Sequence, residues 1–476
     1  MEFTPVGSRR PLPAIERHDV PWGGEMNDVL QGRGVGAHRW RPALLSAVLS
    51  AVMVAGWWGG ASAAEWPQFR GPGGAGVGES SVPVTWSDTQ HLRWKTPLPG
   101  PGSSSPIVQG DHVFVTCYSG AGGAGERATE PAKLQRHILC VRKADGAVLW
   151  QRDLAAELPE DAYEGFLTEH GYASSTPVTD DGGTVFAFFG KSGVVAFDTA
   201  GEKLWQTAVG KESSNRHWGS AASPVLHGDT VIVNAAEESQ SIRALDQTSG
   251  REIWKAEGAA LELAYGTPGL VSLDNGSQEL VIAVPGEVWG MDPATGKMLW
   301  HADMGLTGNV SPSVIVDGTT VYVFGGFRSS GSLAVRAGGR GDVTRSHVLW
   351  TSRNSSYVAT PLLHEGHLYW IDDRGQAFCA AAETGELVYR ERVDGMTQGG
   401  RPVYASPVLS AGRLYVVSRW SGTFVLPAAP RYEILTQNRF ESDDSDFSGT
   451  PAISDGDIFL RSGRFLYCVG ATDRQE

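Results

Sequence analysis

Two segments of the chain, ALDQTSGREIW at residues 244–254 and GMDPATGKMLW at residues 290–300, repeat one pattern 46 residues apart. Each has an Asp followed four residues later by a Gly. This spacing predicts a tight turn between two strands, because Asp and Thr side chains hydrogen-bond nearby backbone groups and Gly adopts positive φ. The Trp four residues after the Gly falls in the second strand. A chain that repeats this unit is restricted to architectures made of many short antiparallel strands.

A second marker, a proline preceded by a small residue and followed by a strand pattern, sets the number of repeats. The intervals between successive markers are 71, 47, 44, 44, 49, 46 and 44 residues, and the prolines are Pro106, Pro177, Pro224, Pro268, Pro312, Pro361, Pro407 and Pro451. A period of 44 to 49 residues with four short strands per repeat is typical of a propeller blade. We therefore predict an all-β, eight-bladed β-propeller with four-stranded antiparallel blades.

The eighth repeat lacks its fourth strand. Three strand patterns follow Pro451, whereas residues 91–98, HLRWKTPL, carry a Trp with no strands before it. Pairing the two would close the ring through an N-terminal strand that completes the last blade, and would cover the exposed sheet edges. We expect one propeller domain over residues 65–476, with Tyr389 in the Trp position of one blade. The Trp residues expected to be structural are Trp94, Trp150, Trp205, Trp254, Trp300 and Trp350.

Residues 1–64 are expected to be an N-terminal extension that contains a signal peptide. Residues 43–56 are apolar, arginines precede them, and Ala61-Ser62-Ala63-Ala64 follows. This pattern predicts export to the periplasm or outside the cell, with cleavage near Ala63 or Ala64. The first 25 residues fit no targeting pattern, and a start at Met26 would give a signal of ordinary length. Because no later apolar run reaches the roughly 18 residues of a membrane span, we expect no span in the mature protein, which is expected to be a monomer.

Charge and motifs limit the chemistry that the chain can support. The formal net charge of -14 disfavours nucleic acid as a partner. Residues 364–367, HEGH, lack the spacing of a zinc-binding helix, so no metal site is expected. There is no G-x-S-x-G nucleophile motif and no catalytic residue that the sequence identifies. Catalysis is therefore left open.

The four cysteines are expected to be core residues. Cys140, Cys379 and Cys468 take the same position in the third strands of their repeats, where other repeats have Ala or Gly. Cys117 lies one strand away from Cys140. An oxidising compartment would allow a disulfide between these two, although the expected register places them diagonally.

The repeat resembles the pyrroloquinoline-quinone (PQQ) repeat propellers, whose blades carry the motif A-x-D-x-x-T-G-x-x-x-W. Ala244, Asp246, Gly250 and Trp254 match this motif, and WPQFRGPGG from Trp66 is similar to the start of secreted bacterial members. The resemblance covers roughly residues 65–470. It implies either of two functions. The alcohol and glucose dehydrogenases of this group hold PQQ and calcium, typically against an adjacent Cys-Cys pair that this chain lacks, whereas its outer-membrane assembly lipoproteins use the propeller for protein contacts.

Candidate binding residues come from the segments before each marker proline and from the loops between second and third strands. Strand order places both groups on one face of a propeller, called here the upper face. Two insertions, at roughly residues 118–136 and 155–172, lie on the same face and are expected to form a partial lid. Polar and aromatic groups that converge on a central opening are typical of ligand sites. The candidates are His170, Tyr172, Arg216, Trp218, Tyr265, Asn309, Arg328, Tyr357, Arg374, Arg401, Tyr404, Arg419 and Arg464.

Six arginines among these candidates predict an anionic ligand, which could be a small molecule, an acidic glycan or a protein segment. The alternative is that they pair with nearby aspartates, namely Asp372, Asp373, Asp443, Asp444 and Asp446. Three functions stay open: a binding or assembly scaffold, a quinoprotein-like oxidoreductase, and a carbohydrate-active hydrolase or lyase. PQQ with calcium would support the second, and two carboxylates at the opening would support the third.

Overall fold

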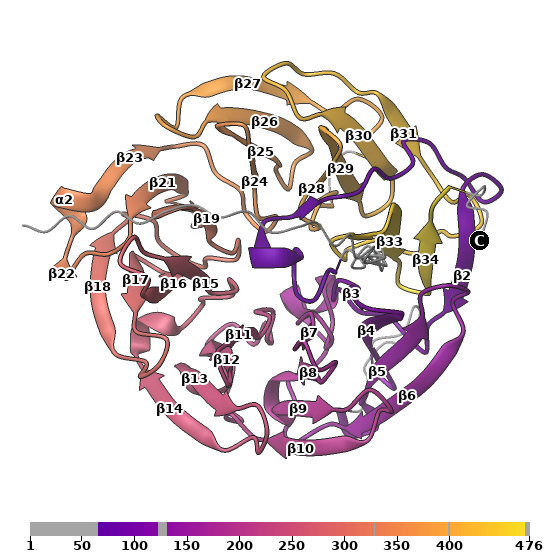
Figure 1. Ribbon diagram of the computed structural model, residues 1–476, viewed down its shortest axis with the longest axis horizontal. Coiled ribbons are helices and arrows are strands. Elements are labelled where there is room, and N and C mark those ends of the chain that lie inside the picture. Colours follow the sequence, from indigo (N-terminus) through magenta and orange to yellow (C-terminus); the bar gives the residue numbers. More distant parts are fainter. Residues whose placement is uncertain (1–64, 122–130, 328, 398–399, 472–476) are drawn as a thin grey trace, which may run out of the picture. The chain divides into compact units, whose positions relative to one another are not determined.

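The computed structural model describes residues 65–121, 131–327, 329–397 and 400–471. Eight antiparallel sheets surround a central axis, and the strands of each sheet follow one another from the axis outward (Figure 1). The structure therefore confirms the eight-bladed β-propeller. Among the residues described, no helix is long and apolar enough to cross a membrane.

The first four blades follow the repeat closely, and the fourth gains an extra outer strand, β22 (Gly341–Asp342), in parallel with β18. Their strands are β3 (Ile107–Gln109), β4 (His112–Ser119), β5 (Gln135–Arg142) and β6 (Val148–Ala155); β7 (Val178–Thr179), β8 (Val185–Phe188), β9 (Val194–Phe197) and β10 (Lys203–Thr207); β11 (Val225–His227), β12 (Thr230–Ala235), β13 (Ser241–Asp246) and β14 (Glu252–Glu257); and β15 (Gly269–Ser272), β16 (Gln278–Val284), β17 (Glu287–Met291) and β18 (Met298–Asp303).

The last four blades are built in the same way, and the seventh gains β1 (Val77–Gly78) in parallel with its innermost strand. Their strands are β19 (Ile315–Asp317), β20 (Thr320–Gly325), β21 (Gly331–Arg336) and β23 (Val348–Ser352); β24 (Leu362–His364), β25 (His367–Ile371), β26 (Gln376–Ala381) and β27 (Leu387–Arg392); β28 (Val408–Ser410), β29 (Arg413–Ser418), β30 (Gly422–Pro427) and β31 (Thr436–Asn438); and β32 (Ala452–Ser454), β33 (Asp457–Arg461), β34 (Phe465–Val469) and β2 (Leu92–Pro97).

The eighth blade joins two distant parts of the chain. Strand β2 pairs antiparallel with β34, and Trp94 lies opposite Cys468 in the register. The outermost strand of this sheet thus precedes the first blade in sequence, and its three inner strands come after the seventh. Every described blade has neighbours on both sides, as Figure 1 shows.

The turn motif explains how neighbouring blades pack. Trp254, in the fourth strand of the third blade, donates from Nε1 to the carbonyl of Pro293, 3.0 Å away in the next blade's turn. Gly296 of that turn has φ 69°, and a Cβ there would lie 2.3 Å from the Trp254 ring. Gly296 is therefore required for two reasons. The turn needs its positive φ, and the Trp254 ring leaves no room for a side chain. The same contact joins Trp94 to Gly146, Trp150 to Gly201, Trp205 to Gly250 and Trp350 to Gly385.

Trp300 is the exception to this contact. Its Nε1 donates to Glu279 Oε2 of its own blade at 2.7 Å, and its ring packs directly over Gly290. Strand β22 covers the edge beside it, which leaves Trp300 completely buried. The insertion that forms β22 thus replaces the usual contact with the next blade.

Short helices connect some of the strands, and the core lies between adjacent blades. The 3-10 helices are η1 (Pro72–Gly74), η2 (Pro131–Lys133), η3 (Gly165–Glu169), η4 (Gly190–Ser192) and η5 (Ala259–Leu261), and the α-helices are α1 (Ala236–Ser239) and α2 (Thr344–His347). Apolar side chains on facing sheets form a series of clusters, such as Ile138, Phe114 and Trp150 with Val185 and Phe197 of the next blade.

No disulfide joins Cys117 and Cys140, a pairing that the sequence left open, and all four cysteines are free and buried. Cys117 lies opposite His137 on β5, three residues from Cys140. Residues separated by an odd number along a strand point to opposite faces of the sheet. Accordingly, Cys117 packs toward the eighth blade and Cys140 toward the second, so the first blade separates their thiols.

Candidate functional site

The N-terminal segment, residues 66–78, crosses the lower end of the central channel, and it is called the floor. Trp66 pairs with Val108 of the first blade, and the amide of Thr179 donates to the carbonyl of Pro67 at 2.9 Å. On the opposite side, the buried Arg70 guanidinium donates to the carbonyls of Thr360 and Pro361 at 2.6 and 2.9 Å. Figure 1 shows this segment at the centre of the ring. The channel is therefore closed from below.

The wall above the floor is a circle of eight hydroxyl side chains, one from each blade, called the hydroxyl circle. Each oxygen accepts a hydrogen bond from the backbone N–H of the corresponding residue in the preceding blade, over 2.9 to 3.1 Å. Ser and Thr alternate strictly around the axis. The members are Ser105, Thr176, Ser223, Thr267, Ser313, Thr360, Ser406 and Thr450.

The second insertion of the first blade covers the upper end of the channel, and residues 155–172 are called the lid. The Phe166 ring lies 4.6 Å from that of Trp218 and within 6.4 Å of those of Tyr357 and Tyr404. The guanidinium of Arg401 lies 4.9 Å from the Phe166 ring centroid. This insertion therefore lies over the opening, as the sequence predicts. Of the first insertion, residues 122–130 lie outside the described residues.

Arg419 of the seventh blade holds the lid across the ring. Glu169 Oε2 forms an ion pair with Arg419 Nη1 of the seventh blade at 2.6 Å. Arg419 also lies 3.7 Å from Asp446, and its guanidinium packs 4.7 Å from the Tyr404 ring centroid. Because Arg419 is almost fully buried, this pair is better shielded from solvent than a surface salt bridge.

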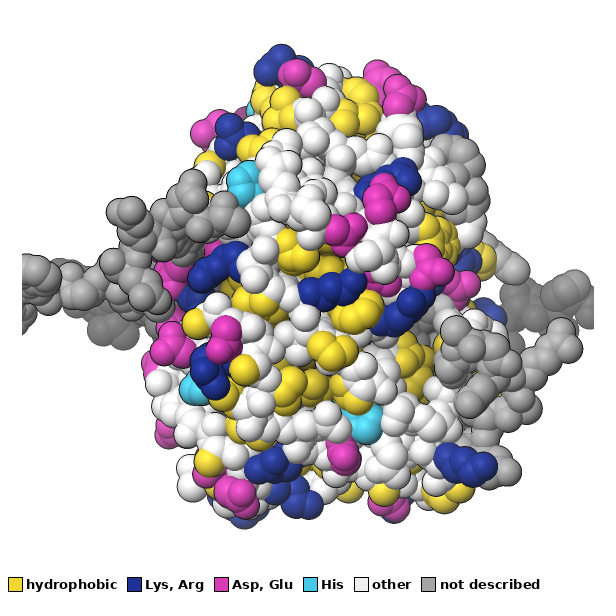
Figure 2. Space-filling view, turned by 90° about the vertical axis from the view of Figure 1, so that its right-hand side faces the viewer, with side chains coloured by type: hydrophobic (Ala, Val, Ile, Leu, Met, Phe, Trp, Pro, Cys, Tyr) yellow, Lys and Arg dark blue, Asp and Glu magenta, His cyan; other side chains and the backbone are white. Residues whose placement is uncertain are grey.

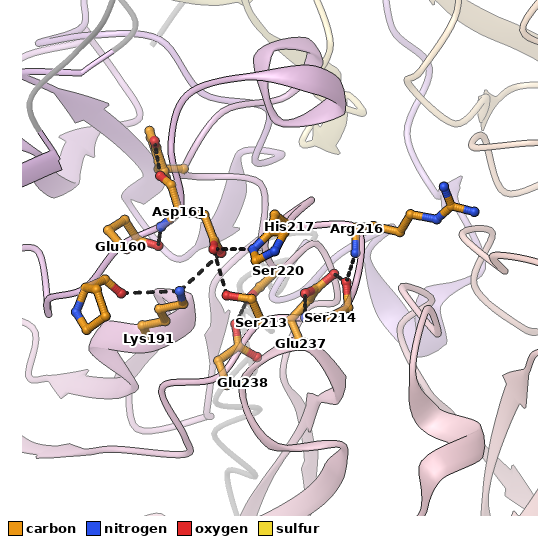
Figure 3. A network of polar contacts seen from close by, with 12 residues as sticks. Glu160, Asp161, Lys191, Ser213, Ser214, Arg216, His217, Ser220, Glu237 and Glu238 are labelled. Carbon is orange, nitrogen blue, oxygen red and sulfur yellow. Dashed lines mark hydrogen bonds and ion pairs between the residues drawn. The ribbon is translucent and has the colours of Figure 1, made fainter.

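A buried polar network fixes the other end of the lid to the second and third blades (Figure 3). Asp161 Oδ1 accepts hydrogen bonds from Ser213 Oγ at 2.7 Å and from His217 Nδ1 at 3.0 Å, and Lys191 lies 3.2 Å from its other oxygen. Although burial by itself raises the pKa of Asp161, these hydrogen bonds and Lys191 lower it overall. Arg136 pairs with the neighbouring Glu160. The lid is thus anchored by charge pairs and not only by Phe166.

Two acidic residues of α1 lie beneath this network. Glu237 accepts hydrogen bonds from Tyr265, at 2.6 Å, and from the amide and hydroxyl of Ser214. Glu238 Oε1 accepts a hydrogen bond from the Ser220 hydroxyl, while its Oε2 has no hydrogen-bond partner among the described residues. Burial raises the pKa of Glu238 to about 7. Part of its population is therefore neutral at physiological pH.

Between floor and lid lies a cavity of about 130 Å³, called the chamber. Phe69 of the floor lines it below, and Phe166, Trp218, Tyr265 and Tyr404 line it above. Eight hydroxyls of the circle lie between these ends. The nearby His170 donates or accepts through Nδ1 with Ser174 Oγ at 2.6 Å, and burial lowers its pKa to about 4. His170 is therefore neutral at pH 7.

A second hollow, open to solvent, lies beside the lid over the fifth and sixth blades, and it is called the basic groove. Its volume is about 540 Å³. The groove has four arginines against two aspartates, and three aromatic rings lie among them. Its charged and aromatic lining consists of Phe327, Arg353, Tyr357, Asp372, Asp373, Arg374, Phe378, Arg390 and Arg401.

The arginines of the basic groove differ in their partners. Arg390 donates to Gln376 and packs over Phe378, and Arg401 lies 3.8 Å from Asp373. Arg353 and Arg374 are exposed, and within the described ranges neither guanidinium forms an ion pair. On the side of the propeller that Figure 2 shows, by contrast, acidic and basic side chains are interspersed.

The predicted binding residues are divided among these sites. His170, Trp218, Tyr265 and Tyr404 line the chamber, whereas Tyr357, Arg374 and Arg401 line the basic groove. Tyr172 is buried within the lid, where its hydroxyl donates to the Asp161 carbonyl. The exposed Arg216 packs over Trp218, the buried Asn309 donates to Ser311, and Arg464 pairs with Asp444. Arg328 lies outside the described residues. The expected pairing of arginines with nearby aspartates holds for Arg401, Arg419 and Arg464.

Sequence reasoning missed three features of the upper face. Phe166 lies in an insertion with no repeat pattern, and Arg353 follows a fourth strand, a region that was not considered. The hydroxyl circle had a visible signal, because a Ser or Thr precedes every marker proline. In the fifth blade, however, the member of the circle is Ser313, which follows Pro312, and not Ser311, which precedes it. The residue before the marker proline therefore does not always identify the member of the circle.

The chamber does not fit PQQ, a planar tricarboxylate quinone. Its described lining contains no Arg or Lys that could pair with carboxylates and no Asp or Glu that could coordinate calcium. Its volume also lies below the roughly 300 to 1,000 Å³ of pockets for drug-sized ligands. Elsewhere in the described chain, no group of three or more His, Cys, Asp or Glu side chains is arranged to hold a metal ion.

Comparison with known proteins agrees with the propeller architecture. The family profile described as outer membrane protein assembly factor BamB matches residues 135–391. The structure of BamB from Moraxella catarrhalis is similar at 15% identity, with 80% of this chain and 98% of that chain covered and a TM-score of 0.55. A europium-containing methanol dehydrogenase is similar at 11% identity, with 85% and 98% covered and a TM-score of 0.55. At these identities the likeness shows the fold alone. No curated protein matches the sequence.

Proposed function

The chain belongs to the family of the outer membrane protein assembly factor BamB, and from that premise we propose that it is an exported, non-catalytic scaffold that binds an acidic segment of a partner protein. The segment lies in the basic groove on the upper face. The propeller supplies a rigid frame, and the loops between its strands supply the binding groups. Residues 1–64 contain the export signal, with cleavage near Ala63 or Ala64.

One observation carries this proposal: Arg353 and Arg374 are exposed in an open groove and form no ion pair among the described residues, although the protein is acidic overall. Asp373, next to Arg374 in sequence, lies 3.8 Å from Arg401, and Asp372 accepts the amides of Arg374 and Gln376 and so stabilises its own turn. The two guanidinium groups are thus available to a carboxylate from outside. Guanidinium groups present paired donors that match carboxylate oxygens.

The aromatic rings favour a protein segment over an inorganic anion. Phe327 is 46% exposed, and its ring lies 6.1 Å from that of Tyr357. Phe378 lines the same groove beneath Arg390. The exposed Phe327 ring close to arginines without ion pairs matches a segment in which acidic and apolar side chains alternate, and Tyr and Arg are enriched where proteins bind one another.

The test is charge reversal in the groove. We expect the purified propeller to bind a peptide of alternating Glu and Leu at low salt, and Arg353→Glu with Arg374→Glu to weaken this binding at least tenfold, which is about 1.4 kcal/mol. Binding should also weaken at physiological salt, because exposed charges are screened. The matched control is Arg251→Glu, which makes the same charge change on an exposed residue in the turn after β13.

Two further probes separate the alternatives. An acidic glycan that binds better than the peptide would overturn the choice of a protein segment. PQQ with calcium, followed by absorbance and melting temperature, tests the oxidoreductase alternative. Peptide binding that is absent, or that is equally affected by the Arg251→Glu control, would overturn the proposed function.

A further inference from the structure

The chamber is a second candidate site, separate from the basic groove, and its wall has unused hydrogen-bonding capacity. Each oxygen of the hydroxyl circle accepts one backbone N–H. Within the described part of the chain, none of the eight hydroxyl groups donates its own hydrogen. Seven of them are at least nine-tenths buried, since only Thr267 is more exposed. A hydroxyl has one donor and two acceptor positions, so each keeps one of each for a ligand.

A buried hydroxyl group that does not donate its hydrogen lowers the stability of the protein. Each unsatisfied donor costs about 1 to 3 kcal/mol when it is removed from water. Seven such buried groups around one cavity therefore require occupants, which are either ordered waters or a ligand with many hydrogen-bonding groups.

The ends of the chamber indicate which ligand it would bind. Phe69 lies below the hydroxyl circle, and Phe166 and Trp218 lie above it. Aromatic faces pack well against C–H groups and exclude water, so a column of water alone leaves these ends poorly solvated. The described lining holds no Lys, Arg, Asp or Glu, and an isolated ion there would lose its hydration without a counter-charge.

From this arrangement we propose that the chamber binds a small, uncharged polyhydroxylated molecule, such as a monosaccharide or a cyclitol. Its hydroxyls at the edge of the ring bond to the hydroxyl circle, and its C–H faces pack against Phe69 below and Phe166 above. The volume of about 130 Å³ is close to the roughly 150 Å³ of an engineered cavity that binds benzene, so one six-membered ring is the appropriate size.

The lid offers an entrance for such a ligand. Gly165 and Gly171, with φ of 58° and 73°, lie at the two ends of η3, which carries Phe166. Glu169 of the same helix is held by Arg419. Rotation at the two glycines, with loss of that ion pair, would lift Phe166 from the chamber. Small residues at the ends of a moving element are typical hinge positions.

The test uses the complete propeller and calorimetric titration with glycerol, myo-inositol and glucose, with sulfate and benzene as contrasting probes. We expect at least one polyol to bind with a Kd in the millimolar range or below. Ala221→Leu, which places a larger side chain in the chamber, should weaken this binding at least tenfold, and Val358→Ile should weaken it less. Ala200→Leu, at an exposed turn, is the matched control.

The outcomes are distinct. If no polyol binds, or if Ala221→Leu and Ala200→Leu bind equally well, the chamber holds only water and the proposal is wrong. Preference for sulfate or for benzene would also overturn it. Should Ala221→Leu fail to fold, Val358→Ile and Phe166→Ala still test the site. Phe166→Ala should speed both the association and the dissociation of the polyol. Arg374→Glu should leave polyol binding unchanged, which separates this site from the basic groove.

Discussion

Replacing Gly296 by Ala tests how the blades are joined. The new Cβ would meet two obstacles. The backbone at Gly296 has φ 69°, which costs an Ala about 1 to 2 kcal/mol. The Cβ would also lie 2.3 Å from the ring of Trp254, and forcing an extra carbon into a packed interface costs about 1 to 3 kcal/mol. We therefore expect Gly296→Ala to lower the free energy of unfolding by about 2 to 5 kcal/mol.

Gly276 in the same blade is the matched control. It has φ 81°, but a Cβ there would have no atom within 4 Å. Gly276→Ala should therefore cost only the backbone contribution, about 1 to 2 kcal/mol. The difference between the two variants measures the contact with Trp254 alone.

Urea unfolding, followed by both circular dichroism and tryptophan fluorescence, is the assay. Coincidence of the two transitions is needed before free energies are compared. In a double-mutant cycle, Gly296→Ala in a Trp254→Ala background should cost no more than Gly276→Ala. Equal losses for the two glycine variants, or an unchanged cost of Gly296→Ala once Trp254 is removed, would refute the packing argument.

Three other predictions concern stability. Trp254→Ala should cost about 3 to 5 kcal/mol, as expected for a buried Trp, and a thermal or urea midpoint that hardly moves would show that the ring does not join the blades. Deletion of residues 65–98 removes the floor and β2, so the melting temperature should fall sharply; a truncated protein that melts like its parent would contradict the role of that pairing. Glu238 has a folded-state pKa of about 7, above its usual value, so the folded state holds the extra proton and stability falls as pH rises from about 4.5 to 7, by about 3 kcal/mol. Glu238→Gln should remove that decline in pH-dependent urea midpoints, and an unchanged profile would show that Glu238 is ionised throughout.

The blade count was predictable because local chemistry determines it. The turn of Asp246 and Gly250 needs particular residues at fixed spacing, and Trp254 adds a third position. Such short-range requirements leave a periodic record in the sequence. The pairing of Cys117 and Cys140, by contrast, depends on register. The sequence indicates a diagonal placement and leaves a disulfide open, whereas Cys117 lies opposite His137, three residues from Cys140 on β5, so the two side chains point to opposite faces of the sheet.

The candidate site was predictable only in part. Aromatic and basic residues before each inner strand indicated the upper face, because strand order alone brings them together. Which of them line the chamber and which the basic groove depends on Phe166, whose partners come from the third, sixth and seventh blades. The position of a long insertion over a ring is a tertiary property that repeat periodicity does not record.

The hydroxyl circle has a consequence for chain connectivity. All eight of its hydrogen bonds run in the same sense around the axis, from the amide of one blade to the hydroxyl of the next, and Thr450 closes it by donating to Ser105. A closed loop of this kind has no beginning, so its integrity is independent of where the polypeptide starts. Joining the present ends and opening the chain between two other blades would preserve every link. Removing one blade would instead leave an amide and a hydroxyl facing each other across a gap, so the circle fixes the number of blades while leaving the order of the chain free.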